Sequence, residues 1–232
     1  MIPLRDINPT ERFAVVTFIL IVLNIGVFLY EITLGRIGGE LFMQNFALVP
    51  AKLFASSPTA GQPVPVIATL ITSMFLHGGF LHIAGNMLYL WIFGNNIEDA
   101  MGRLRFPVFY ALCGLFAAFA HAYANRNSTV PMIGASGAIS GVLGAYLLLY
   151  PRARVVTLVF FGFYVRTVQI PAMIVLGFWF ALQFLNAMLD SGSRGGVAWY
   201  AHIAGFVAGM LLVGVFKRRD VSFWRGRGYH YL

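Results

Sequence analysis

Charged side chains are scarce in this chain. Only 10% of its 232 residues are Asp, Glu, Lys or Arg, whereas 59% are hydrophobic. Soluble domains carry about 25% charged residues, so the composition excludes an ordinary soluble domain and leaves little chain for a water-soluble module. Although the length alone would allow one or two domains, we expect a single polytopic membrane domain surrounded by the lipid bilayer.

Cysteine is nearly absent as well. The single residue Cys113 excludes an intramolecular disulfide. Because it lies within an apolar run, a buried and unreactive thiol is its expected state. The net charge of +8 does not indicate nucleic-acid binding, since the basic residues are thinly spread and gather only beside apolar runs. Positive charge at such positions is typical of membrane topology.

What the chain has instead is long apolar runs, and a membrane span needs about 20 mostly apolar residues. We assign six spans, at residues 13–34, 80–97, 104–123, 136–150, 168–189 and 199–216. The sequence therefore predicts an all-α membrane protein, a six-helix bundle over residues 13–217. It follows a polar segment at 1–12, which shows no cleavable signal pattern, and precedes a basic tail at 218–232.

The basic residues divide unequally between alternate connections. Twelve lie on one side: Arg5, Arg12, Arg103, Arg105, Arg152, Arg154, Arg166, Lys217, Arg218, Arg219, Arg225 and Arg227. Four lie on the other: Arg36, Lys52, Arg126 and Arg194. The positive-inside rule then predicts that both termini are cytoplasmic.

The fourth span is short. Residues 135–150 would reach about 24 Å at 1.5 Å per residue, against a hydrocarbon core of about 30 Å. Pro151 and Arg152 fix its cytoplasmic end, so its outer end stops below the polar stretch at 125–129. Non-helical backbone at that depth is tolerated only against protein or a water-filled cavity. We therefore expect Ser136 to face a recessed, wet pocket that opens outward.

Small residues line one face of the fourth span and one face of the sixth. The two faces carry Ser136, Gly137, Ser140, Gly141 and Gly144, and His202, Gly205 and Gly209. Such stripes let helices approach closely, which would bring His202 near Ser136 at matching depth. The Gly-x-Ser-Gly pattern alone is equally typical of plain helix packing. A histidine within the bilayer is costly, however, and usually marks a functional site.

A serine beside a histidine suggests nucleophilic catalysis, with Ser136 as nucleophile and His202 as general base. No acid completes a triad, because all eight acidic residues lie at span ends or in connections. These are Asp6, Glu11, Glu31, Glu40, Glu98, Asp99, Asp190 and Asp220. The sequence thus predicts a Ser–His dyad.

The second span adds two polar side chains on one face, His82 and Asn86, preceded by His77. They could stabilise an oxyanion together with the Ser136 N–H, at about 3 kcal/mol per donor, or merely join helices, at about 0.6 kcal/mol. Metal binding by His77, His82 and His202 is a third interpretation, disfavoured because no carboxylate accompanies them. We expect no metal and no other cofactor. His121 is interpreted as an interfacial or hydrogen-bonded histidine.

Together these residues resemble the rhomboid family of intramembrane serine proteases. The resemblance lies in three segments, His77 to Asn86, Gly134 to Gly137, and Ala201 to Gly205 with Gly209. It implies a six-helix bundle that cleaves transmembrane substrates near their extracytoplasmic end. By position it gives Ser136 and His202 the roles of nucleophile and base, and His82 and Asn86 those of oxyanion-hole residues. Glu98 would be a structural acidic residue.

The resemblance further implies that substrates enter past the fifth span near Phe178, Trp179 and Phe180, and that a loop at about 190–198 covers the site. The chain departs from the family pattern twice. A Trp-Arg pair of the first loop is replaced near Ala68 and Thr69, and Ser140 stands where an aromatic would stack on the catalytic histidine. The group that orients His202 is therefore unassigned.

The sequence predicts an intramembrane serine endopeptidase in the plasma membrane of a bacterium or archaeon, since no organelle-targeting segment is visible. The rival interpretation is a non-enzymatic membrane protein, either an inactive rhomboid-like binder of transmembrane helices or a small transporter. Inactive relatives usually lack the serine or the histidine, and transporters often show inverted repeats, which this sequence does not.

Overall fold

The computed structural model describes residues 1–55, 63–162, 164–189 and 198–224. The apolar runs form its long helices: α1 (Val15–Thr33), α5 (Phe80–Met101), α6 (Arg105–Ala124), α7 (Ser136–Leu149), α8 (Ala172–Leu189) and α9 (Trp199–Phe216). Four of these, α1, α6, α8 and α9, are long and apolar enough to cross a membrane. A fifth candidate span joins residues 66–75 to α5 through a bend of 81°. The described part of the chain is therefore mostly helical, with four to five candidate membrane spans.

Helix α7 is the short apolar helix, with 14 residues. Its residues from Gly137 to Tyr146 are all buried, because neighbouring helices cover it on several sides. Phe93 of α5 packs edge-on against Tyr146, with ring centroids 5.0 Å apart. Helix α7 thus lies at the centre of the bundle, and the surrounding helices hold the position of its first residue, Ser136.

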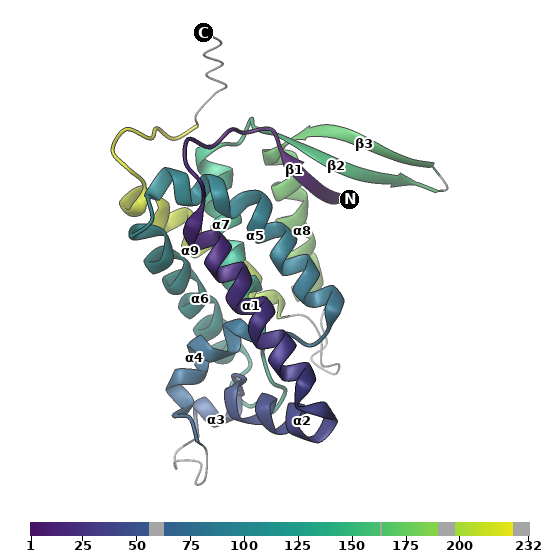
Figure 1. The fold of residues 1–232 in the computed structure, drawn as a ribbon, viewed down its shortest axis with the longest axis vertical. Helices are drawn as coiled ribbons and strands as arrows, with labels where there is room; N and C mark the ends of the chain where they lie inside the picture. Colours follow the sequence, from purple (N-terminus) through teal and green to yellow (C-terminus); the bar gives the residue numbers. More distant parts are fainter. Residues whose placement is uncertain (56–62, 163, 190–197, 225–232) are drawn as a thin grey trace.

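A three-stranded antiparallel sheet, in the order β1-β2-β3, projects from one end of the bundle (Figure 1). Its strands are β1 (Ile2–Asp6), β2 (Arg154–Phe161) and β3 (Tyr164–Pro171). The all-α prediction was wrong in this part of the chain. Residues 154–161 are rich in β-branched and aromatic side chains, which favour a strand, and Gly162 (φ +60°) turns the chain into β3.

The sheet also corrects one predicted boundary and gives the N-terminal segment a structure. Val168 pairs with Thr157 in the ladder, so the fifth span begins at Ala172 rather than at residue 168. Pro171 ends the strand. A proline is tolerated there because no backbone N–H is needed beyond the last hydrogen bond of the ladder. The N-terminal segment is more than a polar tail, since Ile2 pairs with Leu158 across β1 and β2.

Short helices cross the opposite end of the bundle (Figure 1). They are α2 (Gly35–Phe46), α3 (Pro50–Leu53), η1 (Val66–Ala68), α4 (Thr69–Thr72) and η2 (Ser73–Phe75). Leu48 and Met132 exchange backbone hydrogen bonds at 3.2 and 2.7 Å. The Gly134 N–H donates to the Ser73 carbonyl at 2.8 Å. These bonds fix the extended segment that leads into α7.

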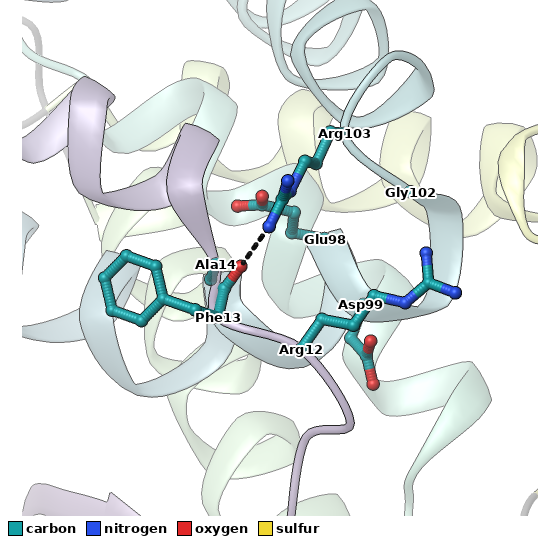
Figure 2. A pocket seen from close by; sticks show the side chains of 7 residues that line it. All are labelled: Arg12, Phe13, Ala14, Glu98, Asp99, Gly102 and Arg103. Atoms are coloured by element: carbon teal, nitrogen blue, oxygen red, sulfur yellow. Dashed lines mark hydrogen bonds between the residues drawn. The ribbon is translucent and has the colours of Figure 1, made fainter.

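Glu98, near the end of α5, holds the start of α1. Its carboxylate accepts the backbone N–H of Val16 at 3.0 Å and the N–H and hydroxyl of Thr17 at 2.7 and 2.8 Å. Helix α1 has no side-chain cap of its own, so this buried carboxylate satisfies donors that would otherwise be unpaired. The pocket beside it, of about 20 Å³, is shown in Figure 2, where Arg103 reaches the Phe13 carbonyl. Glu98 therefore has the structural role that the resemblance implies.

Candidate active site

Ser136 is the first residue of α7 and is half-buried. The chain reaches it through Gly134, whose φ of +114° lies in a region that side chains disfavour. A methyl group at Gly134 would also come within 2.8 Å of Nε2 of His82. A glycine is therefore required here both by the backbone conformation and by the ring packed against it.

His202 lies on the first turn of α9 and is 8% exposed. Its Nε2 atom is 2.8 Å from Oγ of Ser136. This is the distance at which a general base takes a proton from a hydroxyl. The structure thus brings together the two residues for which the sequence predicts a dyad, from helices that are 66 residues apart along the chain.

Gln183, on α8, contacts the other nitrogen of the same ring. Its Oε1 is 2.7 Å from Nδ1 of His202, and its Nε2 donates to the Trp179 carbonyl at 3.2 Å. Because that donation turns the amide so that its oxygen faces the ring, Nδ1 must carry the proton. The lone pair of Nε2 then faces the Ser136 hydroxyl, which is the tautomer a general base needs.

Two aromatic rings flank His202. The Trp179 ring from α8 is 5.8 Å away and tilted by 37°, and the Trp199 ring is 6.2 Å away and nearly perpendicular. Ser140, which occupies the position of the expected aromatic, instead donates its hydroxyl to the Ser136 carbonyl at 2.6 Å. The aromatic contact absent from α7 is thus supplied by neighbouring helices.

His82 and Asn86 lie against the same turn of chain from the α5 side. The Gly78 N–H donates to Nδ1 of His82 at 3.4 Å, so the proton of this ring sits on Nε2, the atom that faces Gly134. A methyl at Gly134 would lie 3.5 Å from Nδ2 of Asn86. That amide nitrogen is buried and has no hydrogen-bond partner among the described residues. Two N–H donors are therefore available two residues before Ser136.

His77 is buried, and both of its ring nitrogens lack a partner in the described part of the chain. Its ring packs edge-on against His82, with centroids 5.1 Å apart. Within the described residues, no three His, Cys, Asp or Glu side chains gather as metal ligands would. His77 therefore supports the position of His82 by ring packing.

The glycines of the two stripes lie where α7 and α9 touch. A methyl at Gly205 would overlap the Gly137 carbonyl, and one at Gly209 would overlap the Gly141 carbonyl. On the other side of α7, a methyl at Gly141 would overlap Cys113 of α6. The backbones of α7 and α9 are thus in contact, and this contact sets the approach of His202 to Ser136.

A family profile described as "Rhomboid domain" matches residues 65–219 of this chain. That range is well over half of the 232 residues and contains every site residue named above. The chain belongs to the rhomboid family. Rhomboid proteins are generally intramembrane proteases, and the apolar helices found here are those of a membrane protein.

Several rhomboid relatives are similar over much of the chain. Rhomboid protein 1, mitochondrial, of Saccharomyces cerevisiae is 32% identical over 150 residues, 62% of this chain and 40% of the relative. Rhomboid protease GluP of Bacillus subtilis is 35% identical over 157 residues, 66% of this chain and 28% of the relative. The mitochondrial presenilin-associated rhomboid-like protein of Bos taurus is 30% identical over 129 residues, 52% of this chain and 33% of the relative. This rhomboid chain thus spans less than half the length of these relatives.

Sequence reasoning missed Gln183. Gln183 is one of two amides, with Asn186, in an otherwise apolar helix, and that was the available signal, because polar groups in lipid are expensive. Of the residues that the resemblance places at the substrate entrance of a rhomboid, Trp179 instead faces His202, Phe180 stacks on Phe206 with centroids 4.6 Å apart, and Phe178 is exposed. The predicted covering loop lies almost wholly in residues 190–197, outside the described residues.

Proposed function

We propose that this rhomboid is an intramembrane serine endopeptidase that uses a Ser136–His202 dyad. The observation that carries the proposal is the hydrogen-bonded chain of three groups: Ser136 Oγ, 2.8 Å from His202 Nε2, and His202 Nδ1, 2.7 Å from Gln183 Oε1. Nucleophile, base and a group that orients the base form the arrangement needed for acyl transfer. Plain helix packing would not require this alignment of a histidine.

The reaction begins when Ser136 Oγ attacks a peptide carbonyl and its proton passes to His202 Nε2. The C–O bond forms as the carbonyl becomes an oxyanion. The imidazolium then gives the proton to the leaving amine as the C–N bond breaks, which leaves an acyl-enzyme on Ser136. A water molecule, deprotonated by the same nitrogen, then attacks the acyl carbon. The bond from that carbon to Ser136 Oγ breaks, His202 returns the proton to Oγ, and the acid product leaves.

The oxyanion is held by donors that already point to this turn. His82 offers its Nε2–H, Asn86 its unpartnered Nδ2–H, and Ser136 its own backbone N–H, which at the first turn of α7 has no intrahelical acceptor. Donors fixed in place before reaction cost no reorganisation when the charge develops, and each contributes about 3 kcal/mol. This role explains why the buried amide nitrogen of Asn86 has no hydrogen-bond partner in the part of the chain that the structure describes.

The imidazolium formed during the reaction has no carboxylate within the described residues around it. The Gln183 carbonyl oxygen and the Trp179 ring face it instead. A neutral acceptor and an aromatic face stabilise a transient cation without the several kcal/mol that a permanently buried charge costs. Neutral groups around His202 therefore suit a base that is charged for only part of each turnover.

The substrates we propose are transmembrane segments of membrane proteins that unwind near Ser136, because a stable helix hides its carbonyls in internal hydrogen bonds. Small or helix-breaking residues near the cut would favour that unwinding. For the enzyme itself we propose six spans, α7 included, with both termini cytoplasmic and the site near the extracytoplasmic face, in a bacterial or archaeal plasma membrane. The excess of Lys and Arg at the sheet end supports this orientation.

Cleavage of single-span reporter proteins by the purified chain tests the proposal. Wild-type protein should cut a reporter with a glycine-rich span, and Ser136→Ala should abolish the cut. Ser140→Ala is the matched control, because it removes a serine hydroxyl one turn away that faces the helix backbone. Cleavage that survives Ser136→Ala, or absence of cleavage with every reporter, would favour the non-enzymatic helix binder.

A further inference from the structure

Four arginines line one hollow at the end of the bundle opposite Ser136. The hollow has a volume of about 450 Å³ and is bounded by Met101, Gly102, Arg103, Leu104, Arg105, Arg218 and Arg219. These residues come from the connection between α5 and α6 and from the chain that follows α9. No carboxylate is among them. The hollow therefore concentrates positive charge, and the carboxylates nearest to it, Glu11 and Asp220, lie outside its lining.

The arginines have little to hold them within the protein. Arg105 donates to the Lys217 carbonyl at 3.4 Å and Arg103 to the Phe13 carbonyl at 3.5 Å, both at the long limit of a hydrogen bond. Arg218 lies 3.7 Å from the exposed carboxylates of Glu11 and Asp220, pairs that contribute little in water. Its Nε is buried without a partner in the described residues.

Orientation in the membrane explains positive charge at this end. It does not explain why four arginines gather around one hollow. Arg152 and Arg166 lie at the same end, and neither lines the hollow. Helix α6 also begins at Arg105, so the positive end of its dipole adds to the charge there. Guanidinium groups around a hollow at a helix start suit an oxyanion with several acceptor oxygens.

Exposed apolar side chains lie close along the chain to the hollow. Leu104, in its wall, is 88% exposed. Near the ends of the two helices that flank it, Val108 of α6 and Val215 of α9 are exposed as well, at 51% and 78%. A ligand with a charged head at the arginines and hydrocarbon along these side chains would satisfy both regions, whereas a free anion would satisfy only the first.

We propose that this hollow binds the phosphodiester headgroup of an anionic phospholipid. The headgroup lies among Arg103, Arg105, Arg218 and Arg219, and an acyl chain runs past Leu104 along α6 and α9. Basic pockets between membrane helices recognise anionic headgroups in this way. The site is separate from the dyad, and it stands whether or not the proposed peptidase activity does.

Thermal unfolding of the purified full chain in dodecyl maltoside tests the site. Three additives are compared at equal concentration: phosphatidylglycerol, phosphatidylcholine with the same acyl chains, and glycerol phosphate. The test variant is Arg105→Gln with Arg219→Gln. The control is Arg152→Gln with Arg166→Gln, which removes the same charge from the same end but outside the hollow. Unfolding without additive shows whether each variant folds.

We expect phosphatidylglycerol to raise the melting temperature of the wild type and the control by several degrees, and the test variant to lose at least half of that shift. Added salt should shrink the shift, because the contact is electrostatic. Equal shifts with phosphatidylcholine, or an undiminished shift in the test variant, would overturn the proposal. A glycerol phosphate shift as large as that of the lipid would replace it with a soluble-anion site.

Discussion

Gln183 of α8 places its side-chain oxygen 2.7 Å from Nδ1 of His202 on α9. This contact determines which ring nitrogen is free to accept a proton from Ser136. Because Gln183 belongs to α8, the helix past which rhomboid substrates are expected to enter, a movement of α8 would also change the partner of the proposed base. If substrates enter past α8 as the resemblance implies, the helix that they pass also carries the amide that contacts the histidine.

Replacing Gln183 tests this orientation. Gln183→Leu removes the acceptor at Nδ1, and we expect kcat to fall about five- to tenfold with KM little changed, since one hydrogen bond of about 1–1.4 kcal/mol then no longer selects the tautomer. Gln183→Glu keeps an acceptor and should retain more activity, with a shifted pH profile. Phe184→Ala, an exposed neighbour, is the control. An unchanged kcat in Gln183→Leu would show that Gln183 does not orient His202.

Asn86 is expected to contribute to catalysis without contributing to stability. Asn86→Leu removes a donor that has no partner among the described residues, so kcat should fall by about 10²–10³ while the melting temperature stays the same or rises. Asn96→Leu is the control on the same helix, because Asn96 donates to Asp6 at 2.8 Å and its loss should destabilise the fold. If Asn86→Leu destabilised the protein and left kcat intact, Asn86 would be a packing residue.

Because the backbones of α7 and α9 are in contact, a methyl group added between them should destabilise the fold. In Gly209→Ala the added carbon would overlap the Gly141 carbonyl. We expect a loss of about 1–3 kcal/mol in unfolding free energy, typical of overpacked cores, and a lower kcat as His202 moves from Ser136. Gly177→Ala on α8 has nothing within 4 Å of the added carbon and should unfold like the wild type. Equal unfolding of both variants would contradict the close contact.

Asp6 on β1 makes the stability of the sheet end depend on pH. Burial raises its pKa from 3.8 to about 6, although hydrogen bonds from Tyr146 and Asn96 act to lower it. The folded state therefore binds the proton more tightly than the unfolded state does. The resulting stability is complete below about pH 4 and is lost as the pH rises through about 6, by about 3 kcal/mol in all.

Unfolding measured from about pH 4 to about pH 7 checks this sign. Wild-type protein should lose stability over that window. Asp6→Asn should lack this part of the slope, because its amide cannot titrate but still accepts from Tyr146. Asp220→Asn, an exposed carboxylate, should retain the slope of the wild type. If the pH dependence of stability survives in Asp6→Asn, it comes from another titratable group.

The dyad could be predicted because each partner lies on a stripe of small residues, and two such stripes have few ways to pack. Gln183 could not, because α8 carries two amides, Gln183 and Asn186, and nothing in an apolar helix tells which of them faces the histidine. The sheet was missed for a different reason. Residues 154–161 carry a strand composition, but the partner strand β1 is only five residues long and lies about 150 residues away, so no local turn joins them. Only the short turn between β2 and β3 could have been predicted from neighbouring residues.

The most direct test of the central claim is labelling by a fluorophosphonate, which reacts only with an activated serine, followed by peptide mass spectrometry. We expect a phosphonate adduct on Ser136 in wild-type protein and in Ser140→Ala, and its loss in His202→Ala. An adduct on another serine, or equal labelling of Ser136 when His202 is absent, would contradict a Ser136–His202 dyad.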